Sequence, residues 1–246
     1  MNPILKAMAS HRSVRQYAQQ PLDESCVRQA VEAAQRAASS SNVQAYSVLR
    51  VTDPERRQKL AELAGQQQQV HAAGGFFVIC ADQRRNVLLG ERLERPHQAN
   101  LETFLLAVVD ASLFAQNLAL AFESQGLGTC FIGGLRNHLA QVDELLELPQ
   151  HVMALYGLCA GLPAEDPSRS TPRPRLPVEA VLLHERYPSD EDLMAQIASY
   201  DAQIGEWYAQ SGRPGYDWSG GVSRNFQKAK REGLLDYYTS KGARFR

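Results

Sequence analysis

The alternation of apolar and polar residues predicts an ordered succession of helices and strands. Apolar positions recur at helical spacing over residues 21–38, 54–64, 100–123, 137–148 and 190–207. Short apolar runs predict strands over residues 46–51, 76–81, 126–134 and 153–161. Strict alternation of strand and helix is missing, so the order favours the α+β class over a doubly wound parallel sheet.

Two of these segments are apolar almost throughout. Residues 76–81 form a continuous apolar run, which suits a strand covered on both faces at the centre of a sheet. Residues 100–123 carry apolar or small side chains around nearly the whole helical circumference. We therefore expect a buried core helix, or one that packs on another subunit. We expect no membrane span, since no run approaches the roughly 18 apolar residues that a span requires.

The last third of the chain differs in composition. Residues 163–177 include five prolines, too many for a helix or a central strand, so we expect a structured loop or an extended arm. A polar helix, a glycine-rich turn over 211–221 and a basic tail follow. We expect one domain over residues 1–246, with a polar excursion that begins near residue 178.

Charge and cysteine usage exclude several classes of protein. The net charge of -1 provides no dominant basic field, so binding to nucleic acid or to an anionic membrane is not expected. The four cysteines show neither a CxxC pair nor zinc-type spacing, and the first residues do not resemble a secretory signal. These features favour reduced cysteines in a cytoplasmic protein.

The first candidate site is the segment His11, Arg12, Ser13 and Arg15. Two guanidiniums, an imidazole and a hydroxyl lie within a few residues, ahead of the helix expected from residue 21. Arginine binds phosphate through two hydrogen bonds, and a helix start adds backbone N–H donors. The segment therefore indicates an anion site, and the alternative is a solvated basic turn.

Three further segments offer polar or flexible groups. Ser39, Ser40 and Ser41 present consecutive hydroxyls that suit phosphate or ribityl oxygens, or they form the loop that ends a helix. Gln67 belongs to a run of glutamines whose amides can both donate and accept, as the edge of a heterocycle requires, or which form a solvated loop. Gly133 and Gly134 allow close backbone approach to a flat ligand, or they form a tight turn at a strand end.

Arg173 and Arg175 lie in the proline-rich segment, whose restricted backbone would hold two cations in place for a second phosphate contact. The alternative is an exposed loop with solubilising charges. The glycine-rich segment matches neither GxGxxG nor a P-loop, and the chain has neither HExxH nor GxSxG. No hydrolytic machinery is visible, so the basic and hydroxyl groups favour a phosphorylated cofactor that supplies its own chemistry.

Taken in order, HRSVR, SSSN, GLGTCFIGGLRN, GLCAGLP and PRPRLP resemble segments of the nitroreductase family of flavoproteins. The similarity extends from His11 to about Pro177. It is greatest to the branch of NADPH-dependent, oxygen-insensitive major nitroreductases and bacterial FMN reductases. The resemblance implies a central mixed sheet flanked by helices, in an interlocked homodimer with FMN at the subunit interface. The apolar helix expected from residue 100 fits such an interface.

The resemblance also implies roles for individual residues. His11 and Ser13, with Arg173 and Arg175, would hold the FMN phosphate, and Arg15 would lie beside flavin N1 and the C2 carbonyl. Gln67 would meet the pyrimidine edge of the flavin, and Ser39, Ser40 and Ser41 would lie near the ribityl chain. Gly133 and Gly134 would lie near N5. The remaining implied flavin contacts are Arg12, Phe131 and Ile132. No protein acid or base is required, because the flavin itself accepts the hydride.

The implied activity is ping-pong transfer of a hydride from NADPH, or NADH, to FMN and on to nitroaromatics, quinones or free flavins. In the related branch, arginines of a loop after the last long helix hold the NADPH 2′-phosphate, whereas here residues 210–218 contain only Arg213. Arg136, Arg213 or Arg224 would have to supply that charge, and Arg136 is favoured for contact with the open flavin face. Two alternatives are a noncatalytic flavin-binding redox sensor and another flavoenzyme chemistry, such as flavin fragmentation or dehalogenation.

Overall fold

The structure is a computed structural model that describes residues 2–166 and 171–245. The chain divides into two compact units: Met1–Arg169 with Arg231–Arg246, here the main unit, and Ser170–Lys230, here the inserted unit. Residues 167–170 of the expected proline-rich loop lie outside the described residues. Each unit is described separately.

A four-stranded sheet forms the centre of the main unit. Its strands are β1 (Tyr46–Val51), β2 (Gly75–Asp82), β3 (Gly128–Ile132) and β4 (Val152–Gly161), in the order β1-β2-β4-β3. Each pair of neighbouring strands is antiparallel, and a parallel bridge joins Ser13 to β3 at Thr129. Every residue of β2 is buried, as the continuous apolar run predicts. The α+β class and the helix-flanked sheet are confirmed. The four strands pair with one another only in the antiparallel sense, and the parallel bridge at Ser13 lies outside them.

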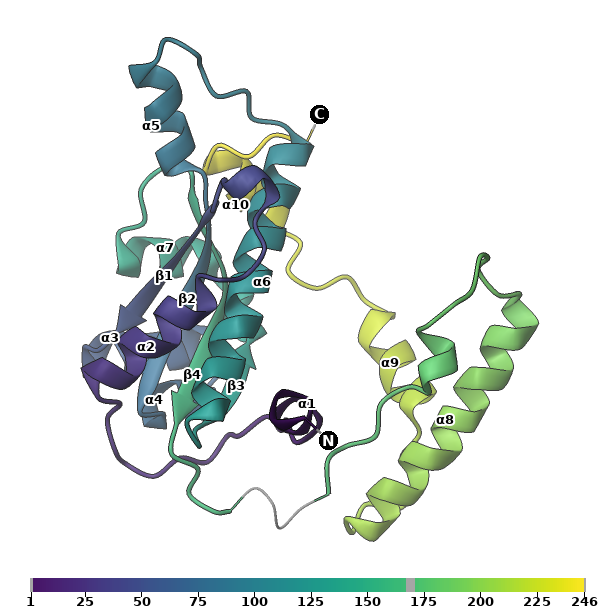
Figure 1. Ribbon diagram of the computed structural model, residues 1–246. Helices are drawn as coiled ribbons and strands as arrows, with labels where there is room; N and C mark the ends of the chain where they lie inside the picture. Colours follow the sequence, from purple (N-terminus) through teal and green to yellow (C-terminus); the bar gives the residue numbers. More distant parts are fainter. Residues whose placement is uncertain (1, 167–170, 246) are drawn as a thin grey trace. The chain divides into compact units, whose positions relative to one another are not determined.

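Helices surround this sheet in the main unit (Figure 1). They are α1 (Pro3–Ala9), α2 (Glu24–Ala34), α3 (Pro54–Leu63), α4 (Gln69–Ala72), α5 (Arg84–Arg92), α6 (Leu101–Ser124), α7 (Leu139–Leu146) and α10 (Leu234–Ser240). Short 3-10 helices span Ser40–Asn42 and Gly133–Asn137. Local chemistry sets the ends: Asp53 caps α3 by accepting from the Arg56 amide, and Gly65 follows α3 with a φ of +87°.

The long helix α6 lies along the sheet (Figure 1) and contacts all four strands and α2. A capping box between Asn100 and Thr103 fixes its start. By length and composition α6 could cross a membrane, so the expectation that no segment is apolar enough was wrong. Core helices of soluble proteins share these properties, and the contacts of α6 with the sheet place it in the core. One stripe at helical spacing stays exposed on α6: Leu101, Leu105, Val109 and Leu113.

The inserted unit contains a 3-10 helix at Val178–Ala180, α8 (Asp190–Gln210) and α9 (Trp218–Phe226). Tyr200, Ile204 and Tyr208 form its small core, against which aromatic side chains pack. Asp201 of α8 fixes the start of α9 by accepting hydrogen bonds from the Ser219 hydroxyl and from the amides of residues 218 and 219. The predicted glycine-rich turn over 211–221 is therefore wrong beyond residue 217, where α9 begins.

The remaining differences concern short helices. The helix expected over 21–38 is the shorter α2, and the one expected over 137–148 begins with 3-10 geometry before α7. The sequence patterns missed α1, α5 and α10, each no longer than nine residues. Neither α1 nor α5 contains a buried residue in the structure. Their large apolar side chains are exposed instead: Ile4, Leu5 and Met8 in α1, and Leu88 and Leu89 in α5.

Candidate functional site

The basic segment 11–15 lies along the edge strand β3. The Val14 amide donates to the Thr129 carbonyl at 2.8 Å, and the Tyr17 hydroxyl donates back to the Val14 carbonyl at 2.6 Å. The expectation that a helix start lies beside this segment was wrong, because α2 begins only at Glu24. A free strand edge offers unpaired backbone groups, and pairing with β3 satisfies some of them.

The cations of this segment have different surroundings. Arg15 is exposed, and its Nη1 lies 3.5 Å from the Ser13 carbonyl, a weak contact that leaves most of the guanidinium donors facing solvent. Arg12 donates to the Ser10 carbonyl at 2.7 Å. His11 is partly buried, with Nδ1 2.7 Å from Oε1 of Glu123, the penultimate residue of α6. The structure thus brings an imidazole, a hydroxyl and two guanidiniums together at one end of β3.

Gln67 and Gly134 lie against each other. The Gln67 side chain donates to the Ala64 carbonyl at 2.8 Å and accepts from Gln69 at 2.9 Å. A Cβ on Gly134 would lie 2.2 Å from the Ala64 carbonyl oxygen and 2.3 Å from Gln67 Nε2. Gly134 therefore serves a close contact with the loop that carries Gln67, whereas the sequence suggested only a turn or an approach to a ligand.

At the end of β3, Phe131 is exposed and packs edge-on against Tyr156 of β4 at 5.7 Å, whereas the Ile132 side chain is fully buried. Arg136 donates to the Leu155 carbonyl at 2.9 Å, and its Nη2 would lie 3.1 Å from a Cβ on Gly133. The strand end thus presents an aromatic ring, two glycines and a guanidinium. At Ile132 only the backbone can meet a ligand.

The serine loop is held by a residue that the sequence patterns did not single out. Asp110 of α6 is 1% exposed, and it accepts hydrogen bonds from the Ser39 hydroxyl at 2.7 Å and from the amides of Ser40 and Ala45. Ser41 has a left-handed backbone with φ 48°. Because the Ser39 hydroxyl is used inside the protein, the exposed Ser40 and Ser41 are the hydroxyls that face outward.

Asp110 and Glu123 are the two site-related residues that sequence reasoning missed. Beyond the first turn of α6 these are the two charged residues of a largely apolar helix, and this departure from the pattern is the signal that could have found them. They lie 13 residues apart (123 minus 110), which is about 20 Å along the helix axis. The serine loop and the basic segment of one chain are therefore anchored at separate points of α6.

The other predicted cations belong to the inserted unit. Arg173 is exposed and lies over the rings of Trp207 and Tyr208, with its Cζ 5.6 and 5.4 Å from their centroids. Arg175 and Arg213 are exposed. The Tyr200 hydroxyl donates to the Pro174 carbonyl at 2.9 Å, so the segment that carries both arginines is tied to α8.

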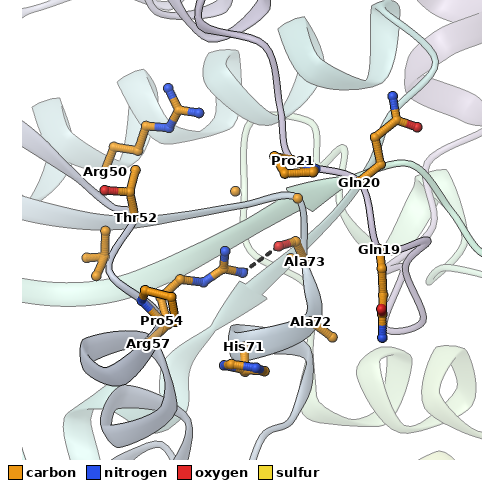
Figure 2. A pocket seen from close by; sticks show the side chains of 13 residues that line it. Gln19, Gln20, Pro21, Arg50, Thr52, Pro54, Arg57, His71, Ala72 and Ala73 are labelled. Atoms are coloured by element: carbon orange, nitrogen blue, oxygen red, sulfur yellow. Dashed lines mark hydrogen bonds between the residues drawn. The ribbon is translucent and has the colours of Figure 1, made fainter.

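A pocket of about 470 Å³ lies beside α4 and is lined by none of the predicted site residues. In its wall, Arg57 donates to the Val70 carbonyl at 2.9 Å and to the Ala73 carbonyl (Figure 2). Burial lowers the pKa of this guanidinium. These hydrogen bonds join α3 to the end of α4. Arg57 therefore fixes the position of α4, which begins two residues after Gln67.

The buried thiols have no nucleophilic character. Cys130 of β3 and Cys159 of β4 face each other in the sheet, and burial raises the pKa of both thiols. A thiol with a raised pKa carries little thiolate at neutral pH. Among residues 2–166 and 171–245, no group of three side chains is placed to hold a metal ion.

Known proteins match this chain over nearly its whole length. The sequence profile of the nitroreductase family matches residues 8–161, and that of the nitroreductase family C-terminal domain matches residues 173–246. An FMN reductase (NADPH) of Bacillus subtilis is 40% identical, and an oxygen-insensitive NADPH nitroreductase of Salmonella typhimurium is 38% identical, each with 98% of both chains covered.

Solved structures agree with the sequence matches. A nitroreductase from B. subtilis superposes with a TM-score of 0.92 at 38% identity, with 98% of both chains covered. An NADPH:FMN oxidoreductase from Vibrio harveyi, complexed with NAD+, superposes with a TM-score of 0.90 at 36% identity over 100% of both chains.

Proposed function

This chain belongs to the nitroreductase family, and on that premise we propose that it is an FMN-dependent oxidoreductase that passes electrons from NADPH to small acceptors. FMN, when bound, supplies the chemistry by taking a hydride from the nicotinamide and releasing it to the acceptor. The observation that carries the proposal is that the basic segment 11–15 pairs with β3, and that Gly133 and Gly134 directly follow this strand.

The residues of segment 11–15, beside β3, have the chemistry that the phosphate and ring of FMN require. His11 and Ser13 would bind the phosphate, together with Arg173 and Arg175 of the inserted unit, and a set of cations and a hydroxyl suits a dianion. The exposed Arg15 would lie beside N1 and the C2 carbonyl, where reduction places negative charge. A guanidinium there is worth about 1–3 kcal/mol.

The other contacts follow from what faces outward. The backbone N–H groups of Gly133 and Gly134 would orient N5, and Phe131 with the backbone of Ile132 would support the ring. The amide of Gln67, which Ala64 and Gln69 hold in place, would meet the pyrimidine edge. Arg12 remains a proposed flavin contact without an assigned atom.

We propose that the site is completed by a second copy of the chain. The serine loop is anchored about 20 Å along α6 from the basic segment, so one chain cannot offer both groups to the same phosphate and ribityl chain. In an interlocked homodimer, Ser40 and Ser41 of one copy would meet the basic segment of the other. The exposed apolar stripe on α6 supplies the surface that such a dimer would bury.

The proposed electron donor is NADPH, with NADH as the weaker alternative. Arg136 and Arg213 are the cations we assign to the dinucleotide, and nitroaromatics, quinones or free flavins are the proposed acceptors. We propose a cytoplasmic enzyme in which residues 1–246 form one catalytic domain with an excursion from about residue 178. The relatives are named as enzymes, which disfavours the noncatalytic sensor.

The test begins with the purified full-length protein. It should be yellow, with the absorbance of FMN, and anaerobic NADPH should bleach that absorbance rapidly. Arg15→Ala should slow the bleaching or weaken FMN binding, whereas Arg28→Ala should not, because Arg28 is an exposed cation on α2. A colourless protein that takes up no FMN would refute the proposal, and bound FMN that neither NADPH nor NADH reduces would favour the sensor.

A further inference from the structure

A carboxylate lies directly beside the proposed phosphate site. Glu123 Oε1 is 2.7 Å from His11 Nδ1 and accepts a hydrogen bond from the Thr129 hydroxyl at 2.5 Å. The Glu123 side chain is 15% exposed, and Thr129 is fully buried. A negative charge so close to a site for a dianion repels the ligand unless a positive charge lies between them.

The position of this acid is also unfavourable within its own helix. Glu123 lies in the last turn of α6, where the helix macrodipole disfavours negative charge, and the turn has no basic residue to compensate. The bonds to His11 and Thr129 are therefore the contacts that stabilise the carboxylate there. This arrangement indicates a role in the site and not in the helix.

Thr129 forms hydrogen bonds with both the acid and the basic segment. Its hydroxyl binds Glu123, and its carbonyl accepts from the Val14 amide at 2.8 Å. One buried residue of β3 therefore fixes the carboxylate relative to the backbone that carries His11. These hydrogen bonds orient the His11 imidazole before any ligand binds.

The hydrogen-bond chemistry of imidazole then decides what Nε2 can offer. A neutral ring that donates Nδ1–H to Glu123 has only an acceptor at Nε2, which cannot bind a dianionic phosphate because that group has no O–H to donate. An imidazolium donates from both nitrogens. Only the charged ring can therefore lie between the carboxylate and a phosphate.

We propose that Glu123 is a positioning residue that pairs with the imidazolium form of His11 and turns its Nε2–H toward the FMN phosphate. The proposal rests on the proposed function, since it requires FMN at this site. The series carboxylate, imidazolium, phosphate then alternates in charge, and the acid strengthens the site for the dianion through the ring between them.

The test compares two flavins that differ only in the phosphate. Apoprotein of the full chain is titrated with FMN and with riboflavin, and quenching of flavin fluorescence gives each Kd. Glu123→Gln keeps an oxygen acceptor for Thr129 but removes the charge, and should weaken FMN binding about tenfold. Riboflavin binding should stay unchanged. Glu102→Gln, the same change at an exposed position in the first turn of α6, should affect neither flavin.

A double substitution separates positioning from support of the fold. In a His11→Ala background the imidazolium between the carboxylate and the phosphate is gone, so adding Glu123→Gln should strengthen FMN binding. A purely structural role would weaken binding in both backgrounds. Thr129→Val, which frees the carboxylate without removing it, provides a second variant and should weaken FMN binding about threefold with riboflavin unaffected.

The outcomes distinguish this inference from the proposed function. Unchanged FMN affinity in Glu123→Gln, equal losses for FMN and riboflavin, or no reversal in the His11→Ala background would overturn the role of Glu123. A wild-type apoprotein that binds neither flavin would overturn the proposed function instead. Urea unfolding of each variant identifies any loss that comes from the fold.

Discussion

Gly134 connects the fold to the proposed flavin site, and a graded series of glycine-to-alanine changes tests that connection. A Cβ at Gly134 would lie 2.2 Å from the Ala64 carbonyl oxygen and 2.3 Å from Gln67 Nε2. The first atom is backbone and cannot move aside. The change should therefore displace the loop and break the Gln67–Ala64 hydrogen bond, at a cost of about 3 kcal/mol. FMN binding should weaken with it, because Gln67 is the proposed partner of the pyrimidine edge.

Two other glycines provide matched controls. At Gly133 the Cβ would meet only the end of the Arg136 side chain, at 3.1 Å, and that side chain can shift, so the cost should stay below about 1 kcal/mol. At Gly233, with φ -75°, nothing lies within 4 Å, and the change should fall within about 0.5 kcal/mol of wild type.

The assay is urea unfolding of the apoprotein by circular dichroism, combined with FMN titration. The structure orders the three glycines as 134, then 133, then 233 in lost stability. The Gly134 variant should lose FMN affinity, and the variant at Gly233, which is no proposed flavin contact, should keep it. Equal stability of the Gly134 and Gly233 variants would refute the packing argument. A destabilised Gly134 variant with unchanged FMN affinity would refute the link to the flavin.

Three further changes probe the supports of the site. Asp110→Ala should cost about 3 kcal/mol and Asp110→Asn about half of that, measured by urea unfolding, because three donors of the serine loop lose a buried acceptor. Arg57→Met should cost about 2 kcal/mol and weaken FMN binding, since two carbonyls at α4 lose their donor, whereas the neighbouring exposed Arg56→Met should change little. A hydrogen bond from the Ser219 hydroxyl lowers the pKa of Asp201, with help from two backbone amides. The stability it contributes is complete above about pH 4, the ordinary range of aspartate, and is lost as pH falls through the lower native pKa. Unfolding followed by tryptophan fluorescence at pH 5 and pH 3 should show a smaller acid loss in Asp201→Asn, because both tryptophans lie in the inserted unit.

The long periodic elements could be predicted from the sequence because burial imposes their pattern. The apolar run at β2 and the helix α6 are strong signals, since β2 is buried along its whole length and α6 contacts all four strands. The start of α9 combines a local N-cap, Asp217, which the sequence analysis did not use, with Asp201, an acceptor supplied by another helix that no local pattern shows. In the same way, no local pattern could show that segment 11–15 pairs with β3, because Thr129 of that strand lies more than 100 residues from Ser13 in sequence.

For the candidate site, the sequence likewise shows the residue types but not the contacts between distant residues. Residue types and their order were enough to single out His11, Arg15 and Gly134 from the sequence. The side-chain contacts could not be predicted from the sequence. Glu123, for example, lies 112 residues from His11, and no local pattern joins the two. The glutamine run illustrates the difference: composition suggested an amide at a ligand, and only the fold places Gln67 between Ala64 and Gln69.

The acids of α6 connect these observations. A helix that contacts every strand of the sheet would be more stable with apolar residues in place of the buried Asp110 and the partly buried Glu123, because a carboxylate shielded from water needs its hydrogen bonds to offset desolvation. Asp110 obtains them from the serine loop and Glu123 from His11 and Thr129, so each acid holds one half of the proposed flavin site. The same helix carries the apolar stripe that a second copy would cover. In the proposed dimer, α6 would therefore couple dimer formation to assembly of the site, and a change on that stripe should weaken FMN binding without touching a flavin contact.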